Sequence, residues 1–265
     1  MAMHPGPRSF GGVNWIGLRT LSEREVRRFL KVAAQTVIGP VVTTLLFLVV
    51  FSVALGRRAA PADGIAYLEF LAPGLIMMTM AQNAFANTSS SLLIAKVQGT
   101  IGDLLMAPLS AGELVCGFAL GGVTRGLLVG IVVGLATWPF VRFGFTHPGY
   151  LMFHALAASL LLALLGILAG LWSQKMDQLA AVTNFVIAPL TFLSGTFYSI
   201  GDLPSAFRAV AYLDPFFYMV DGFRYGIAGH ADGPLAIGLM VMIVANIALA
   251  GASRHLIMIG WQLKP

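Results

Sequence analysis

The amino-acid sequence predicts an all-α polytopic membrane protein with six transmembrane helices. Hydrophobic residues make up 58% of the 265 residues and charged residues only 10%, with a mean hydropathy of +0.85. A soluble domain carries about a quarter charged residues. Several apolar stretches also exceed the ~20 residues that a helix needs to cross a bilayer. Together these observations exclude an ordinary soluble domain.

The first element is residues 1–32, for which we expect a cytoplasmic N-terminus with an amphipathic helix. On a helical wheel of Asn14–Lys31, one side gathers the apolar residues Trp15, Leu18, Val26, Phe29 and Leu30. The other side gathers the charged residues Glu23, Arg24, Arg27, Arg28 and Lys31. A basic amphipathic helix of this kind lies in the interface plane of a membrane. An ordinary surface helix has the same pattern, but here a membrane span follows at once.

Six apolar stretches are interpreted as spans, at about 33–55, 67–93, 114–141, 150–172, 179–197 and 234–259. Pro189 must open the backbone hydrogen-bond ladder of the fifth. Six spans place both termini on the same side. Ten Lys and Arg residues then share the side of the termini, against five on the other. The positive-inside rule makes the side of the termini cytoplasmic.

The second span begins apolar and turns polar. Asn83, Asn87 and Ser90 follow one another at i, i+4 and i+7, on one helical face. Buried amides are costly in lipid, so this face should meet another helix or a cavity. Interhelical hydrogen bonding and the lining of a substrate path both fit this pattern. The candidates for such a path are Gln82, Asn83, Asn87, Ser90 and, in the fifth span, Asn184.

The third span carries a ridge of glycines at four-residue steps, namely Gly122, Gly126, Gly130 and Gly134. Such a ridge lets helix backbones approach closely. Arg125 lies beside it and, with Glu69 of the second span, is an intramembrane charge, a functional candidate by default. A structural role for Arg125 is the preferred interpretation, with Glu113 or Glu69 as its partner. Contact with an anionic substrate is the alternative.

Residues 96–108, KVQGTIGDLLMAP, interrupt the apolar pattern between the second and third spans. Polar positions alternate there with Ile101, Leu104, Leu105 and Met106 at helix-like spacing. The pattern predicts a short amphipathic helix on the cytoplasmic face, where a soluble partner could bind. Residues 198–233 mix aromatic and charged side chains and are too polar to span. We expect one or two short re-entrant helices there, dipping into the outer face.

Motifs for catalysis are missing from the sequence. It has no GxxxxGK[ST] phosphate loop, no HExxH and no GxSxG. Cys116 is the only cysteine and the five histidines form no ligand pair, so no metal site is expected. The net charge of +5 does not indicate nucleic-acid binding, because six of the sixteen Lys and Arg residues precede the first span. The chain is therefore not expected to be an enzyme, and energy for transport would have to come from another chain.

Five segments, in order, resemble the permease subunit of ABC-2 type exporters. They are FLAPGLIMMTMAQNAFAN at Phe70–Asn87, GTIGDLLMAPLS at Gly99–Ser110, GGVTRGLLVG at Gly121–Gly130, SGTFYSIGDLP at Ser194–Pro204 and DPFFYMVDGFRYG at Asp214–Gly226. The YadH-type inner-membrane permeases are the most similar group, and Nod-factor and daunorubicin export permeases are more distant. The resemblance extends along almost the whole chain.

This resemblance implies a homodimer in the bacterial inner membrane, in contact with lipid and with two copies of a cytoplasmic P-loop ATPase. The ATPase would bind ATP and Mg²⁺, so no cofactor is expected in this chain. Segment 96–108 would be the coupling helix, with the docking residues Gln98, Gly99, Thr100, Asp103, Leu104, Leu105 and Pro108. Family substrates are amphipathic drugs, lipids or lipid-linked glycans.

Two other functions remain open at the level of the sequence. The chain could be a non-transport scaffold or regulatory subunit of a larger membrane complex. A proton-driven transporter is the third reading, and the scarcity of acidic residues in the spans disfavours it.

Overall fold

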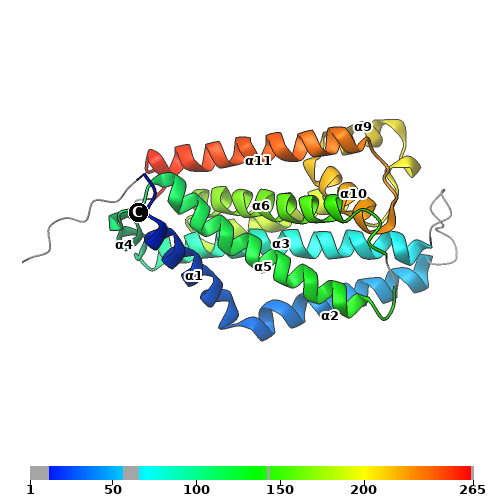
Figure 1. The fold of residues 1–265 in the computed structure, drawn as a ribbon, viewed down its shortest axis with the longest axis horizontal. Coiled ribbons are helices and arrows are strands. Elements are labelled where there is room, and N and C mark those ends of the chain that lie inside the picture. The colour runs from blue at the N-terminus through cyan, green and yellow to red at the C-terminus, as the bar shows by residue number, and fades with distance from the viewer. Residues whose placement is uncertain (1–11, 56–65, 142–143, 264–265) are drawn as a thin grey trace, which may run out of the picture.

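The computed structural model describes residues 12–55, 66–141 and 144–263, and its helices confirm the predicted all-α fold class. Residues 1–11 of the predicted N-terminal region lie outside this part. Long helices run along the molecule's long axis (Figure 1): α2 (Ala33–Leu55), α3 (Tyr67–Val97), α5 (Ala111–Thr137), α6 (Pro148–Trp172) and α11 (Leu235–Met258).

Short helices lie at the two ends of this bundle. One end, called the α4 end below, holds α4 (Ile101–Met106), the start of α1 (Trp15–Leu30) and the end of α11 (Figure 1). The opposite end, the α9 end, holds α9 (Ser205–Leu213) and α10 (Pro215–Ala228). The start of α1 and the end of α11 therefore share one end of the molecule.

Helix α3 forms the centre of the bundle. It is buried along most of its length and packs against α6, α5, α10 and α2. Among the described helices, five are long and apolar enough to cross a membrane, namely α2, α5, α6, the α7–α8 run and α11. At 31 residues α3 is also long enough, but its amides and hydroxyls make it more polar than those five. A helix enclosed by other helices meets little lipid, so α3 remains compatible with the second predicted span, 67–93.

Glycines bring α5 and α6 close to α3. A methyl group on Gly122 would lie 2.8 Å from both Ala163 Cβ and Thr88 Cγ2. On Gly166 of α6 it would lie 2.5 Å from the carbonyl oxygen of Phe85. Gly126 and Gly130 are similarly close to Met80, at 3.0 and 2.9 Å, whereas Gly134 has only Ile76 Cδ1 at 3.9 Å. The close approach therefore involves three of the four ridge glycines.

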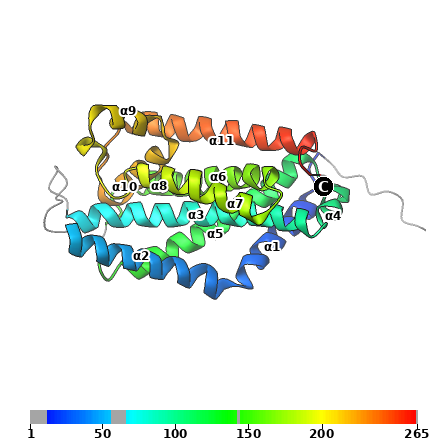
Figure 2. The same cartoon turned by 180° about the vertical axis from the view of Figure 1, so that it is seen from behind.

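The predicted fifth span is a broken helix. It comprises α7 (Met176–Val182), a π-helix over Thr183–Ile187 and α8 (Ala188–Leu193), which follow one another in Figure 2. The wider turn of the π-helix ends two residues before Pro189. The missing N–H of Pro189 removes one hydrogen bond from the helix backbone. The helix ends at Leu193 rather than at Phe197, because Gly195 adopts a left-handed φ of 74°.

Other boundaries shift for local reasons. The third span was expected from 114 to 141, but α5 begins at Ala111 because Ser110 and Glu113 form a capping box, and it ends at Thr137. Segment 198–233 contains a 3-10 turn at Ile200–Asp202 followed by α9 and α10. Its predicted position in the outer membrane face stays a prediction.

Candidate functional site

The segment that joins α3 to α5 is a compact corner at the α4 end. Gly99, with a left-handed φ of 73°, turns the chain directly after α3. Helix α4 follows for six residues only, so the predicted helix over 96–108 is wrong in length: Lys96 and Val97 belong to α3, and Pro108 lies beyond the end. Ile101 and Leu104 of α4 are buried in a small apolar core with Leu21 of α1 and Leu114 of α5.

The outward edge of α4 is apolar. Leu105 is 43% exposed and Met106 is 80% exposed, whereas Leu104 is only 8% exposed. Adjacent residues on a helix point about 100° apart, so Leu104 faces the core while its neighbour faces away. Leu104 is therefore not a docking residue, which corrects the sequence prediction. Met106, which was not among the predicted docking residues, is the most exposed apolar side chain of α4. The remaining candidates are all exposed: Gln98, Gly99, Thr100, Asp103 and Pro108.

Hydrogen bonds fix this corner to its neighbours. The Asn14 side chain donates from Nδ2 to the carbonyl oxygen of Pro108 at 3.0 Å. The two carboxylate oxygens of Glu113 accept from the backbone N–H groups of Asn14 and Ser110. Three such bonds hold the start of α1, the end of the corner and the start of α5 together. Glu113 lies in this cap and is not the partner of Arg125, contrary to one of our suggestions.

The amide face of α3 binds two arginines. Arg125 of α5 donates from Nη2 to Asn83 Oδ1 at 3.0 Å. Arg28 of α1 donates to Oδ1 and to the carbonyl oxygen of Asn87, at 2.9 and 2.7 Å, and Arg28 Nη1 reaches Ser90 Oγ at 3.4 Å. These contacts place three of the candidate path residues between helices. Glu69, the other suggested partner of Arg125, is exposed in the first turn of α3.

The remaining candidate path residues lie apart from this face. Gln82 is partly buried and donates to Thr191 Oγ1 of α8 at 3.4 Å. Asn184 is exposed on the π-helix. The structure therefore does not gather the five candidates into a single site.

Helix α1 carries a buried carboxylate that the helical wheel did not single out. Glu25 is fully buried and binds Arg24 at 2.9 Å and Arg28 at 3.3 Å. It faces α5, where a methyl group on Gly121 would lie 2.5 Å from Glu25 Cβ. Trp15 and Leu30, expected on the apolar side, are exposed. The i, i+3 spacing of Glu25 and Arg28 was the available signal for their ion pair.

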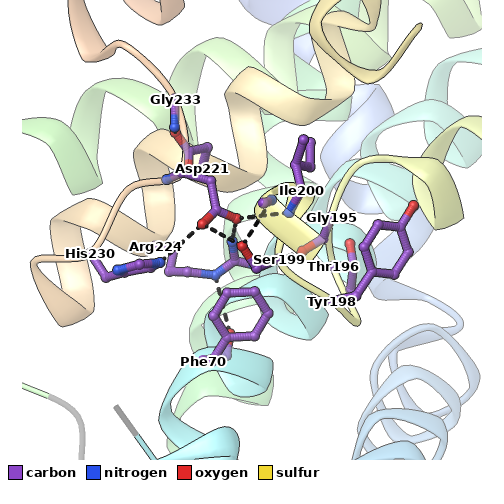
Figure 3. A network of polar contacts seen from close by, with 12 residues as sticks. Phe70, Gly195, Thr196, Tyr198, Ser199, Ile200, Asp221, Arg224, His230 and Gly233 are labelled. Carbon is purple, nitrogen blue, oxygen red and sulfur yellow. Dashed lines mark hydrogen bonds and ion pairs between the residues drawn. The ribbon is translucent and has the colours of Figure 1, made fainter. Parts of the chain in front are cut away.

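A second polar network, which the sequence did not reveal, lies towards the α9 end (Figure 3). Arg224 of α10 is 1% exposed, and its guanidinium lies 3.7 Å from the centre of the Phe70 ring. It donates to the carbonyl oxygens of Gly195 and Phe70, at 2.7 and 3.2 Å, and lies 3.8 Å from Asp232. A buried arginine thus ties α10 to the start of α3 and to the loop after α8.

Two carboxylates complete this network. Asp221 accepts from the backbone N–H groups of Asp232 and Gly233, at 2.7 and 3.1 Å. Asp232 in turn accepts from Ser199 Oγ at 2.8 Å and contacts His230 at 3.1 Å. The network holds the loop before α11 against the loop after α8. Buried charges of this kind must be paired, so the arrangement fixes the geometry of the α9 end.

The fold and its corner define a polytopic helical membrane protein with an exposed connection between two long helices. The family model for the ABC-2 type transporter matches residues 17–228, and the chain belongs to this family. It is 37% identical over 234 residues to the inner membrane transport permease YadH of Escherichia coli K12, a match that covers 88% of this chain and 91% of the relative.

More distant relatives also match most of the chain. The chain is 26% identical over 241 residues to Nodulation protein J of Rhizobium leguminosarum bv. viciae, covering 88% and 90% of the two chains. Nodulation protein J of Rhizobium meliloti is 24% identical over 217 residues, covering 80% of each. Family membership makes this chain the membrane permease component of a transporter, which agrees with the expectation of a non-enzymatic subunit.

Proposed function

We propose that this chain is the permease subunit of an ABC exporter that moves an amphipathic substrate outward through the bacterial inner membrane. A separate P-loop ATPase, in two copies, supplies the energy and binds the ATP and Mg²⁺. Two copies of this chain form the pathway. The α4 end faces the cytoplasm, as the Lys and Arg distribution favours.

The observation that carries this proposal is the shape of the corner between α3 and α5. Its outward edge presents Leu105 and Met106, which no helix of the bundle covers. Its inward edge is anchored by Leu104 in the core and by the Glu113 cap. Exposed apolar side chains on a firmly held support are typical of a docking surface. Such a support would transmit a movement of the ATPase into α3 and α5.

Co-purification with the ATPase tests the proposal. The chain is tagged and co-expressed with the P-loop ATPase, and the variant Leu105→Asp/Met106→Asp is compared with wild type. A carboxylate on each exposed position should weaken an apolar interface, so we expect at least a tenfold loss of ATPase at unchanged chain yield. The matched control is Leu213→Asp, on the exposed side of α9. It should co-purify with as much ATPase as the wild-type chain does.

Two results oppose the proposal. Wild-type recovery of the ATPase with the double variant would show that α4 is not the docking surface. Equal loss with Leu213→Asp would show a general defect instead of a local interface.

A further inference from the structure

A basic hollow lies between α1 and the α4 end of α3, and it meets the corner described above only at Gln98 and Thr100. Its volume is about 570 Å³. Four basic side chains line it, from Arg24, Arg27, Arg28 and Lys31, against the two carboxylates Glu23 and Glu25. The α3 side contributes Ser91, Ile94 and Ala95, with Gln98 and Thr100 beyond.

The acids do not neutralise this hollow. Glu25 is shared by two arginines, and Glu23 is shared by Arg27 and by Arg19, which lies outside the hollow. The ammonium of Lys31 has no acidic partner among the described residues. An excess of positive charge therefore faces the hollow. Arg28 is the most firmly held of its basic groups, because Glu25 and Asn87 fix its guanidinium.

The level of the hollow relative to the membrane follows from the alignment of α2 with α3. These helices pack side by side, and Thr44 bonds Thr79 at 3.0 Å. Ala33 begins α2 eleven residues before Thr44, and Ser90 lies eleven residues after Thr79. Antiparallel helices with equal rise therefore place the start of the apolar helix α2 level with Ser90. The hollow begins at Ser91, just outside the apolar layer, at the depth where lipid head groups lie.

We propose that this hollow binds the phosphate group of an anionic phospholipid. Arginines and lysine supply the positive charge that a phosphodiester requires. Arg28 adds a fixed charge to the hollow, because its N–H groups already bond Glu25, Asn87 and Ser90. The lipid chains would run along α2, which begins two residues after Lys31 and exposes large apolar side chains such as Ile38 and Val42. Because α1 supplies most of the basic groups, a bound head group would hold α1 against α3.

Native mass spectrometry of the delipidated full-length chain in detergent tests this site with phosphatidylglycerol and phosphatidylcholine as probes. The zwitterionic lipid offers no net negative charge, so we expect phosphatidylglycerol to bind about tenfold tighter or more. The variant Arg27→Gln/Lys31→Gln removes two exposed charges without touching Glu25. Its affinity for phosphatidylglycerol should fall about tenfold or more. Arg27→Lys/Lys31→Arg keeps both charges and should bind as wild type does.

A matched control removes two charges at the α4 end but outside the hollow. Lys175→Gln/Arg254→Gln should change the affinity less than about twofold, because neither residue lines the hollow or pairs with a carboxylate that does. Equal binding of the two lipids to wild type, or equal losses in the two Gln variants, would overturn the proposal.

Two further measurements separate the lipid from other anions. Inorganic phosphate in tenfold excess should not displace phosphatidylglycerol, because it lacks the chains that anchor the lipid; displacement would identify a site for soluble phosphate. The variant Arg27→Gln/Lys31→Gln should also keep its ATPase in co-purification. Loss of the ATPase with unchanged lipid affinity would make the hollow a protein docking surface and refute the lipid site.

Discussion

Arg125 of α5 donates a hydrogen bond to Oδ1 of Asn83 on α3, at 3.0 Å. One helical turn further along α3, Asn87 receives Arg28 from α1 in the same way. Two arginines from two helices are thus held on adjacent turns of the most enclosed helix. This arrangement favours the structural role of Arg125 and sets the positions of α1 and α5, the two helices that hold the corner.

Asn83→Leu tests this structural role. It removes the acceptor of a partly buried guanidinium, so we expect the free energy of unfolding in detergent to fall by about 1–3 kcal/mol. Asn184→Leu is the matched control, because its amide is exposed on the π-helix and should change stability by no more than about 0.5 kcal/mol. Equal effects of the two substitutions would indicate that Asn83 does not hold Arg125.

Gly122→Ala and Gly134→Ala test close packing on the same helix. The first places a methyl group 2.8 Å from Ala163 Cβ and Thr88 Cγ2, so stability should fall by about 1–3 kcal/mol. The second finds only Ile76 Cδ1 at 3.9 Å and should gain up to about 1 kcal/mol from helix propensity. Thermal unfolding in detergent measures both. A gain in stability at Gly122 would show that α5 does not pack tightly there.

Arg224→Met tests the buried network at the α9 end. The substitution leaves Asp221 and Asp232 without their cation, and stability should fall by about 3–5 kcal/mol. The control is Arg208→Met in α9, an exposed arginine that donates only to backbone oxygens at the surface. Its cost should stay below about 1.5 kcal/mol. Similar losses in both variants would argue against a special role for the buried arginine.

Asp214 predicts a pH dependence of stability. It caps α10 by accepting from the N–H of Phe216 at 2.9 Å, and burial raises the pKa of its carboxyl to about 6. Since the unfolded pKa is about 4, the folded state binds the proton more tightly. The stabilisation is full below pH ~4 and is lost as the pH rises through about 6.

Thermal midpoints at pH 5 and pH 7 check this dependence. We expect wild type to unfold at a lower temperature at pH 7, and Asp214→Asn, which keeps the acceptor oxygen, to show a smaller difference. Asp202→Asn, an exposed control at the same end, should keep the wild-type difference. A wild-type difference that survives in Asp214→Asn would assign the titration to another group.

The sequence predicted the elements whose signals are local. Residues 33–55 are predominantly apolar, and α2 has those bounds. The spacing of Asn83 and Asn87 predicted a face that meets other helices, and it does. The side of α4 that faces the core was not predictable, because six residues define no periodicity until Leu21 and Leu114 cover one face. Arg224 gave no signal either, since Phe70 and Gly195 lie 154 and 29 residues away.

The coupling of α4 to an ATPase is the central claim, and site-specific crosslinking tests it most directly. Met106→Cys is introduced into a Cys116→Ser background, which removes the only other thiol, and is labelled with a thiol-reactive photocrosslinker in membranes that contain the ATPase. Irradiation should join this chain to the P-loop ATPase, whereas Leu213→Cys in the same background should not. A Met106→Cys chain that inserts normally but yields no ATPase adduct, or an equal adduct from Leu213→Cys, would contradict the account.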